Sequence, residues 1–271
     1  AMGDFALAWD GQAHRVRVME GATDDGTRVH LVEDLPASAE EPSASKALYD
    51  YGMPDNPVTW DQAGTFFPLA WLAMLARLAE AHERRTGRLP RLIVHGNDAQ
   101  TARLIVFLYL LTRDGEQNSI LTAMLEQFPI LRRLRGRILA AYTSHTYGNR
   151  VWRDNTSENR ARLKQLTGIQ SDELLDRLFL RLNVLDETTA AFRASKRLGG
   201  WQGAVSRKHA FDIRRLYDPD IHVQANTNGL DLQWQLQPLN DFLRRRFGED
   251  VDVDRPTPQQ LMAAAEEHKR Q

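Results

Sequence analysis

Four short runs of β-prone residues, each ending in a polar loop, constrain the fold of this chain more than any other feature. The runs span residues 92–94, 137–143, 203–205 and 221–225. Helical sequence follows such loops, and strands that alternate with helices are typical of a parallel sheet with right-handed crossover connections. The sequence therefore predicts an α/β fold, a Rossmann-like parallel sheet with helices that flank it.

The loops after these four runs are rich in histidine, asparagine, aspartate and serine. Their sequences are HGND at 95–98, SHTYGN at 144–149, SRKH at 206–209 and NTNG at 226–229. In a parallel sheet every such loop lies at the carboxyl edge, where ligands bind with help from exposed amides at helix N-termini. Neutral donors and acceptors suit hydroxyl-rich ligands such as sugars. Capping and turn roles are the alternative interpretation of the same residues.

Other patterns predict the elements around the sheet. Alternating residues at 14–18 and 27–32, joined by a turn at 25–26, predict an N-terminal β-hairpin. A mostly helical insertion is expected at about residues 151–196. Before the insertion we expect an irregular connection over 36–57, a long helix over 62–86, and a helix that Asn97 or Asp98 caps and that ends at Gly115. The insertion itself is expected to contain helices over 157–166 and 171–195. After it we expect a helix from the cap Ser206 to about Tyr217, a helix over 239–247 that ends at Gly248, and a last helix that Thr257 caps.

Composition excludes several classes of function. The chain has 271 residues and a formal net charge of -1, whereas a dedicated nucleic-acid binder needs a cationic excess for its phosphate contacts. It has no cysteine, which excludes thiolate nucleophiles and cysteine-ligated zinc, and its 8 histidines form neither HxH nor HExxH. The longest apolar run, 104–111, is too short to cross a bilayer. We therefore expect a cytoplasmic protein with no metal, no cofactor, and neither nucleic acid nor membrane as a partner.

Three histidines are better candidates for a site than most of the others. His95, His145 and His209 each fall at or just after the end of a predicted strand. Several of the remaining histidines belong to the hairpin or to helix surfaces, where solvated roles are expected. The paired aromatic residues near and within the long helix are assigned to the core or to a domain contact rather than to the stacking of sugar rings.

Five segments resemble, in the same order, the N-terminal half of bacterial glycogen and starch synthases and of the related α-glucan phosphorylases. Both are two-domain glycosyltransferases of the GT-B fold. The resemblance covers about residues 14 to 236. The segments are LYDYGMPDNP at 48–57, VHGNDAQTA at 94–102, YTSHT at 142–146, VSRKHAFDIRRLY at 205–217 and NTNGLDLQW at 226–234.

The resemblance implies a retaining glucosyltransferase. Its substrates would be a nucleotide-sugar donor, ADP-glucose, and an α-1,4-glucan acceptor. His145 would be the catalytic residue, as a hydrogen-bond partner of the reacting glucose. Residues 1–271 would form a single incomplete GT-B N-terminal domain without the nucleotide-sugar domain, so the isolated chain is expected to be inactive. The implied substrate-binding residues are Asn97, Asp98, Gln100, His209, Asn228 and Gly229.

Some positions depart from the synthase pattern and leave alternatives open. Ala99 stands where the family has tryptophan, and Asn97 stands where it has a second histidine. Thr146 follows His145 as in phosphorylases, which would carry pyridoxal phosphate in another domain. The alternatives are therefore a phosphorylase-like domain, a non-catalytic glucan-binding relative, or an unrelated α/β domain.

Overall fold

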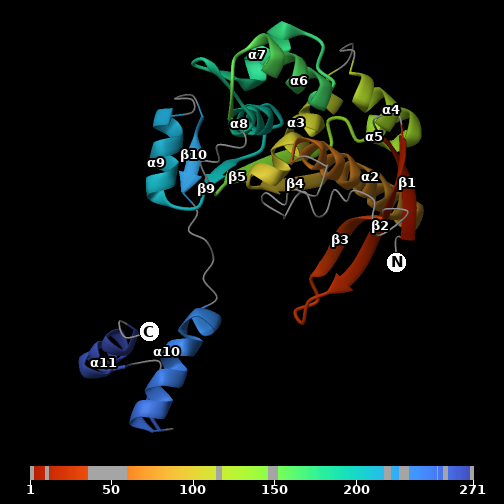
Figure 1. The fold of residues 1–271 in the computed structure, drawn as a ribbon. Coiled ribbons are helices and arrows are strands. Elements are labelled where there is room, and N and C mark those ends of the chain that lie inside the picture. The colour runs from red at the N-terminus through yellow and green to blue at the C-terminus, as the bar shows by residue number, and fades with distance from the viewer. Residues whose placement is uncertain are drawn as a thin grey trace. The chain divides into compact units, whose positions relative to one another are not determined.

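The computed structural model divides the chain into two compact units, Ala1–Thr227 and Asn228–Gln271. The first unit contains the sheets (Figure 1). The second contains α10 (Leu232–Phe247) and α11 (Pro258–His268). The structure describes residues 3–9, 12–35, 60–113, 118–145, 152–216, 221–225, 232–248, 250–252 and 256–268.

A four-stranded parallel sheet forms the centre of the first unit, with helices beside it (Figure 1). The strand order is β10-β9-β5-β4, and every neighbouring pair is parallel. The sheet confirms the four predicted β runs and the prediction of a parallel α/β fold. Its strands are β4 (Leu92–Asn97), β5 (Ile138–Ser144), β9 (Gln202–Ala204) and β10 (Val223–Ala225).

Two crossover helices cover one face of this sheet. Strand order advances in one direction along the sheet, and right-handed crossovers then place successive helices on the same face. The Tyr142 ring of β5 packs edge-on against Phe192 of α8 (Glu187–Arg197), with ring centroids 5.0 Å apart. Gly96 of β4 lies so close to α3 (Ala102–Leu111) that an added Cβ would lie 2.8 Å from the Ile105 side chain.

The N-terminal hairpin is confirmed, and a third strand extends it. β1 (Gly3–Trp9), β2 (Gln12–Ala22) and β3 (Arg28–Leu35) form an antiparallel sheet in the order β1-β2-β3. The turn at Gly26 has a φ of 82°, a conformation that glycine adopts without strain. The long helix is confirmed as α2 (Trp60–Thr86). The expected irregular connection over 36–57 lies outside the described residues.

The predicted single helix over 171–195 is wrong. After α7 (Asp172–Phe179) the chain forms a hairpin of β7 (Leu180–Arg181) and β8 (Val184–Asp186), and α8 begins after it. Leu182 takes a φ of 53° in the turn. The carboxylate of Asp186 accepts the Thr188 backbone N–H at 2.9 Å, which caps α8 and separates it from α7.

The predicted helices that follow β9 are confirmed at the ends named in the prediction, but α10 begins at Leu232 rather than at 239. Ser206 caps α9 (Arg207–Leu216) by accepting the His209 backbone N–H at 3.1 Å. Thr257 caps α11 in the same way, and Gly248 follows α10 with a φ of 99°. The remaining elements are α4 (Ser119–Gln127), α5 (Ile130–Arg133), β6 (Trp152–Asp154), which pairs with β8, and α6 (Ser157–Thr167).

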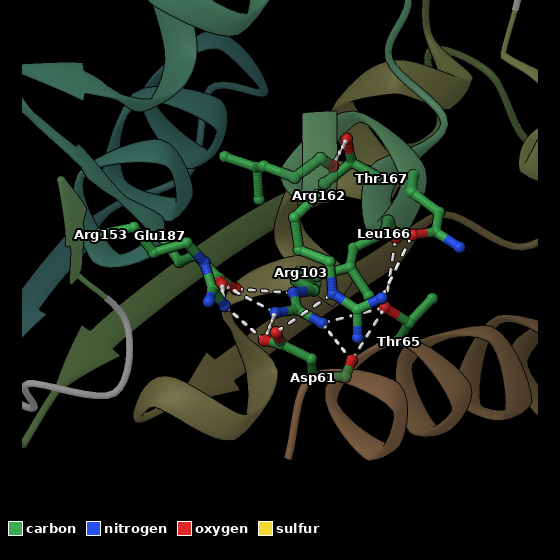
Figure 2. Close-up of polar contacts among 10 residues, drawn as sticks. Asp61, Thr65, Arg103, Arg153, Arg162, Leu166, Thr167 and Glu187 are labelled. Atoms are coloured by element: carbon green, nitrogen blue, oxygen red, sulfur yellow. Dashed lines mark hydrogen bonds and ion pairs between the residues drawn. The ribbon is translucent and has the colours of Figure 1, made fainter. Parts of the chain in front are cut away.

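A buried guanidinium joins α2, α3 and α8 (Figure 2). The Arg103 side chain is 2% exposed and donates to both carboxylate oxygens of Glu187 at 2.7 Å. It also donates to the Asp61 carboxylate at 3.0 Å, to the Asp61 carbonyl and to the Thr65 hydroxyl. Each of its five N–H groups therefore has an acceptor, which is the condition under which a buried charge is tolerated.

Two further arginines extend this cluster to the inserted segment. Arg153 of β6 contacts Asp61 and lies 3.3 Å from Glu187, and Arg162 of α6 lies 3.6 Å from Asp61. Burial would raise the pKa of Asp61, but the charges of Arg103 and Arg153 and their hydrogen bonds outweigh it and hold that pKa below its ordinary value. The cluster thus fixes helices from distant parts of the sequence around two ionised carboxylates.

We predict that Glu187→Gln lowers the free energy of unfolding by about 3 kcal/mol, because it removes one partner of a buried ion pair. Urea denaturation measures the change. Glu173→Gln is the control, since Glu173 pairs with Arg177 at an exposed position where water screens the interaction. An equal loss of stability in the two variants would show that the buried cluster contributes no more than a surface pair.

Candidate functional site

Strands β4 and β5 end side by side at the carboxyl edge of the sheet. Asn97, the last residue of β4, is in register with Thr143 of β5. One residue further, the Asp98 N–H donates to the Thr143 carbonyl at 2.8 Å. The first two predicted polar loops therefore begin next to each other, as parallel pairing requires.

The His145 side chain connects the two loops directly. Its Nε2 lies 2.8 Å from Oδ1 of Asn97. Because an amide oxygen only accepts hydrogen bonds, Nε2 carries a proton, and Nδ1 is an acceptor when the ring is in its neutral form. The His145 backbone N–H lies 3.4 Å from an Asp98 carboxylate oxygen. Three of the predicted site residues thus form one group.

Asp98 has a strained backbone. Its φ of 65° and ψ of -178° lie in a region that glycine almost alone adopts, at a cost of about 1–3 kcal/mol for other residues. Its carbonyl accepts the Thr101 hydroxyl at 2.9 Å. Strain of this kind concentrates at functional sites, because surrounding contacts must hold it in place.

Helical structure begins where the sequence predicts it, with Asp98 at the N-cap position of a 3-10 turn, but neither Asn97 nor Asp98 caps it with its side chain. The Asn97 side chain bonds to His145 instead, and the Asp98 side chain makes no capping bond. A short 3-10 turn, η1 (Ala99–Thr101), comes first, and α3 begins only at Ala102. The two polar side chains are therefore directed to the edge of the sheet rather than used to start the helix.

His95 adds a second imidazole on the same face of β4 as Asn97. Its Nε2 lies 2.8 Å from the Thr143 hydroxyl. Burial lowers the pKa of His95, and the nearby His145 lowers it further. The uncharged form of the His95 ring is therefore favoured.

His209 brings the third predicted loop into the site. It lies in the first turn of α9 and is 7% exposed. Burial lowers the pKa of His209, and His145 lowers it further, while the negative charges of Asp212 and Asp98 oppose the shift. Ala204, the last residue of β9, pairs with Ser144 of β5, so α9 and His209 begin at the same edge of the sheet as His145.

The structure brings together most of the predicted site residues that it describes. Asn97, Asp98, His145 and His209 gather at the carboxyl edge, and we call these four residues the rim. Gln100 lies in η1, partly buried. Asn228 and Gly229 lie outside the described residues.

Sequence reasoning missed Thr143 and Trp201. Thr143 was assigned only to a strand, although two-residue alternation places it on the same face as His145. The Trp201 ring lies 5.0 Å from that of His95, a contact across three strands for which no local pattern exists.

The described side chains contain no group of three or more histidine, aspartate or glutamate residues arranged to hold a metal ion. The described helices likewise include none with the length and apolar character needed to span a membrane.

We predict that Asp98→Gly is more stable than Asp98→Ala by at least ~1 kcal/mol. Both variants lose the carboxylate, but only glycine adopts the backbone conformation at this position without strain. Urea denaturation of the two variants measures the difference. Equal stability would mean that position 98 carries no backbone strain.

Comparison with known proteins adds no assignment to this geometry. A scan against models of protein families finds no match, and a search of the curated proteins returns no significantly similar sequence. The functional conclusion therefore depends on the chemistry of the rim and on the ordered motifs of the sequence.

Proposed function

We propose that this chain is the acceptor-side part of a GT-B glucosyltransferase of the glycogen and starch synthase type. It would transfer glucose from ADP-glucose to the non-reducing end of an α-1,4-glucan with retention. The hydrogen bond between His145 and Asn97 carries the proposal. That bond joins two of the ordered motifs at the edge where open α/β sheets bind their ligands.

The chemistry of the rim supports a sugar as ligand. Asn97 offers amide donors, and the Asp98 carboxylate accepts hydrogen bonds from hydroxyl groups. The lowered pKa values of His95 and His209 favour the uncharged form of both rings. A mostly neutral set of donors and acceptors matches a ligand whose polar groups are hydroxyls.

His145 would act at the reacting glucose. Oδ1 of Asn97 accepts a hydrogen bond from the Nε2–H of His145 and so orients the ring. Nδ1 is then an acceptor for a glucose hydroxyl. The leaving nucleotide phosphate needs positive partners, which the four rim residues do not include. On this proposal the chain holds the sugars, and other parts of the enzyme stabilise the phosphate, so this chain alone binds saccharide without transferring glucose.

A non-catalytic glucan-binding protein is the second candidate. The hydrogen bond between His145 and Asn97 also favours this second candidate. Asn97 stands where the synthase family has a histidine, so the rim has one imidazole fewer than the family pattern. The two candidates differ in whether the complete enzyme uses ADP-glucose. A phosphorylase would be identified if the complete enzyme does not use ADP-glucose but releases glucose 1-phosphate from a glucan when phosphate is present.

We predict that the chain binds maltoheptaose and that His145→Ala weakens this binding about tenfold, because an oriented hydrogen bond to a sugar hydroxyl is lost. Titration calorimetry measures both dissociation constants. His82→Ala, which removes a histidine of α2, is the matched control and should bind as the unaltered chain does. Absence of maltoheptaose binding, or equal effects of the two variants, would refute the proposed function.

A further inference from the structure

An aromatic ring lies on the same face of the sheet as the rim. Trp201 immediately precedes β9, and its carbonyl accepts the Tyr142 N–H at 3.1 Å, so the pairing of β9 with β5 extends to it. This register places Trp201 beside Ala141, which itself pairs with His95 of β4. Because Ala141 is small, the His95 and Trp201 rings meet across it, with centroids 5.0 Å apart and planes inclined at 46°.

This face changes from polar to apolar along the strands. Asn97 and Thr143 lie at the carboxyl end, and the pair of rings comes next. Ile93 and Leu139 follow, in register with each other, and are 76% and 47% exposed. The crossover helices α3 and α8 pack on the opposite face, against Gly96 and Tyr142.

An exposed face of this kind is unusual, because parallel sheets are normally covered on both sides. Trp201 is 38% exposed, and its ring contacts the His95 imidazole. Binding sites for small polar molecules combine aromatic surface with a few placed hydrogen-bonding groups. The juxtaposition of rings and rim therefore has the composition of a ligand subsite.

We propose that Trp201 and His95 form a stacking platform for the glucose units of an α-1,4-glucan that lie beyond the unit held at the rim. This inference rests on the proposed function and assigns a residue that determines chain-length specificity. A pyranose ring has apolar C–H faces and a hydroxyl edge. Its face would pack on the Trp201 ring, and its hydroxyls would reach the exposed Asn97 side chain.

The orientation of His95 suits this role. The Thr143 hydroxyl lies 2.8 Å from its Nε2 and fixes the plane of the ring next to the indole. Ring surfaces of fixed orientation lose little entropy when a ligand packs on them. The Thr143 hydroxyl and the His95 imidazole favour a saccharide over a polypeptide as the ligand. The apolar core of a protein interface would remove water from these polar groups without replacing it.

The test compares saccharides of different length on the full chain. Methyl α-D-glucopyranoside supplies one ring and maltoheptaose supplies several. We expect Trp201→Ala to weaken maltoheptaose binding about tenfold and to leave binding of the single ring unchanged. Trp201→Phe keeps an aromatic surface and should bind maltoheptaose within about threefold of the unaltered chain.

Phe211→Ala is the matched control. Phe211 is an exposed aromatic residue of α9 that lies two positions beyond the buried His209, on the opposite side of the helix. It should not change either affinity. If Trp201→Ala binds maltoheptaose as the unaltered chain does while His145→Ala binds it weakly, the platform is refuted and the proposed function stands.

Two further outcomes would overturn the inference. If neither saccharide binds any variant, the proposed function fails and the platform fails with it. If Trp201→Ala changes the sedimentation coefficient of the chain but not its saccharide affinity, the exposed face is a contact between proteins and not a sugar subsite.

Discussion

The paired guanidinium of Arg103 is the interaction on which the arrangement of this molecule depends. It is buried where α2, α3 and α8 meet, and Glu187 and Asp61 together accept four of its five hydrogen bonds. A buried charge with all its donors satisfied permits one relative position of the elements around it, because any shift leaves a donor without an acceptor. Two of those helices are crossovers of the parallel sheet: α3 lies between β4 and β5, and α8 lies between β5 and β9.

This anchoring explains how the rim keeps its geometry. α3 begins four residues after Asp98, so its fixed position limits how the chain leaves β4. The strained backbone of Asp98 is held on one side by the Thr143 carbonyl and on the other by the Thr101 hydroxyl. The His145 and Asn97 side chains then meet across strands that cannot slide, which is the preorganisation a binding site needs.

Local patterns were enough to predict the four strands of the parallel sheet, the hairpin of β2 and β3, and several capped helices. Ser206 and Thr257 reveal helix starts because their side chains bond to backbone a few residues away. The meeting of the first two loops also followed from sequence, since parallel strands end at a common edge. Contacts between distant residues left no such signal. Arg103 and Glu187 are 84 positions apart, and helical spacing over 171–195 hid the hairpin that separates α7 from α8.

The central claim is that a saccharide binds at the rim through His145, whose Nε2 carries the proton. Nitrogen-15 spectra of the histidine rings, recorded during titration with maltoheptaose, test it most directly. The account predicts a proton on Nε2 of His145 and an Nδ1 signal that shifts as the saccharide binds, while the ring of His82 does not change. A His145 ring protonated on Nδ1, or one whose signals stay constant at saturating maltoheptaose, would contradict it.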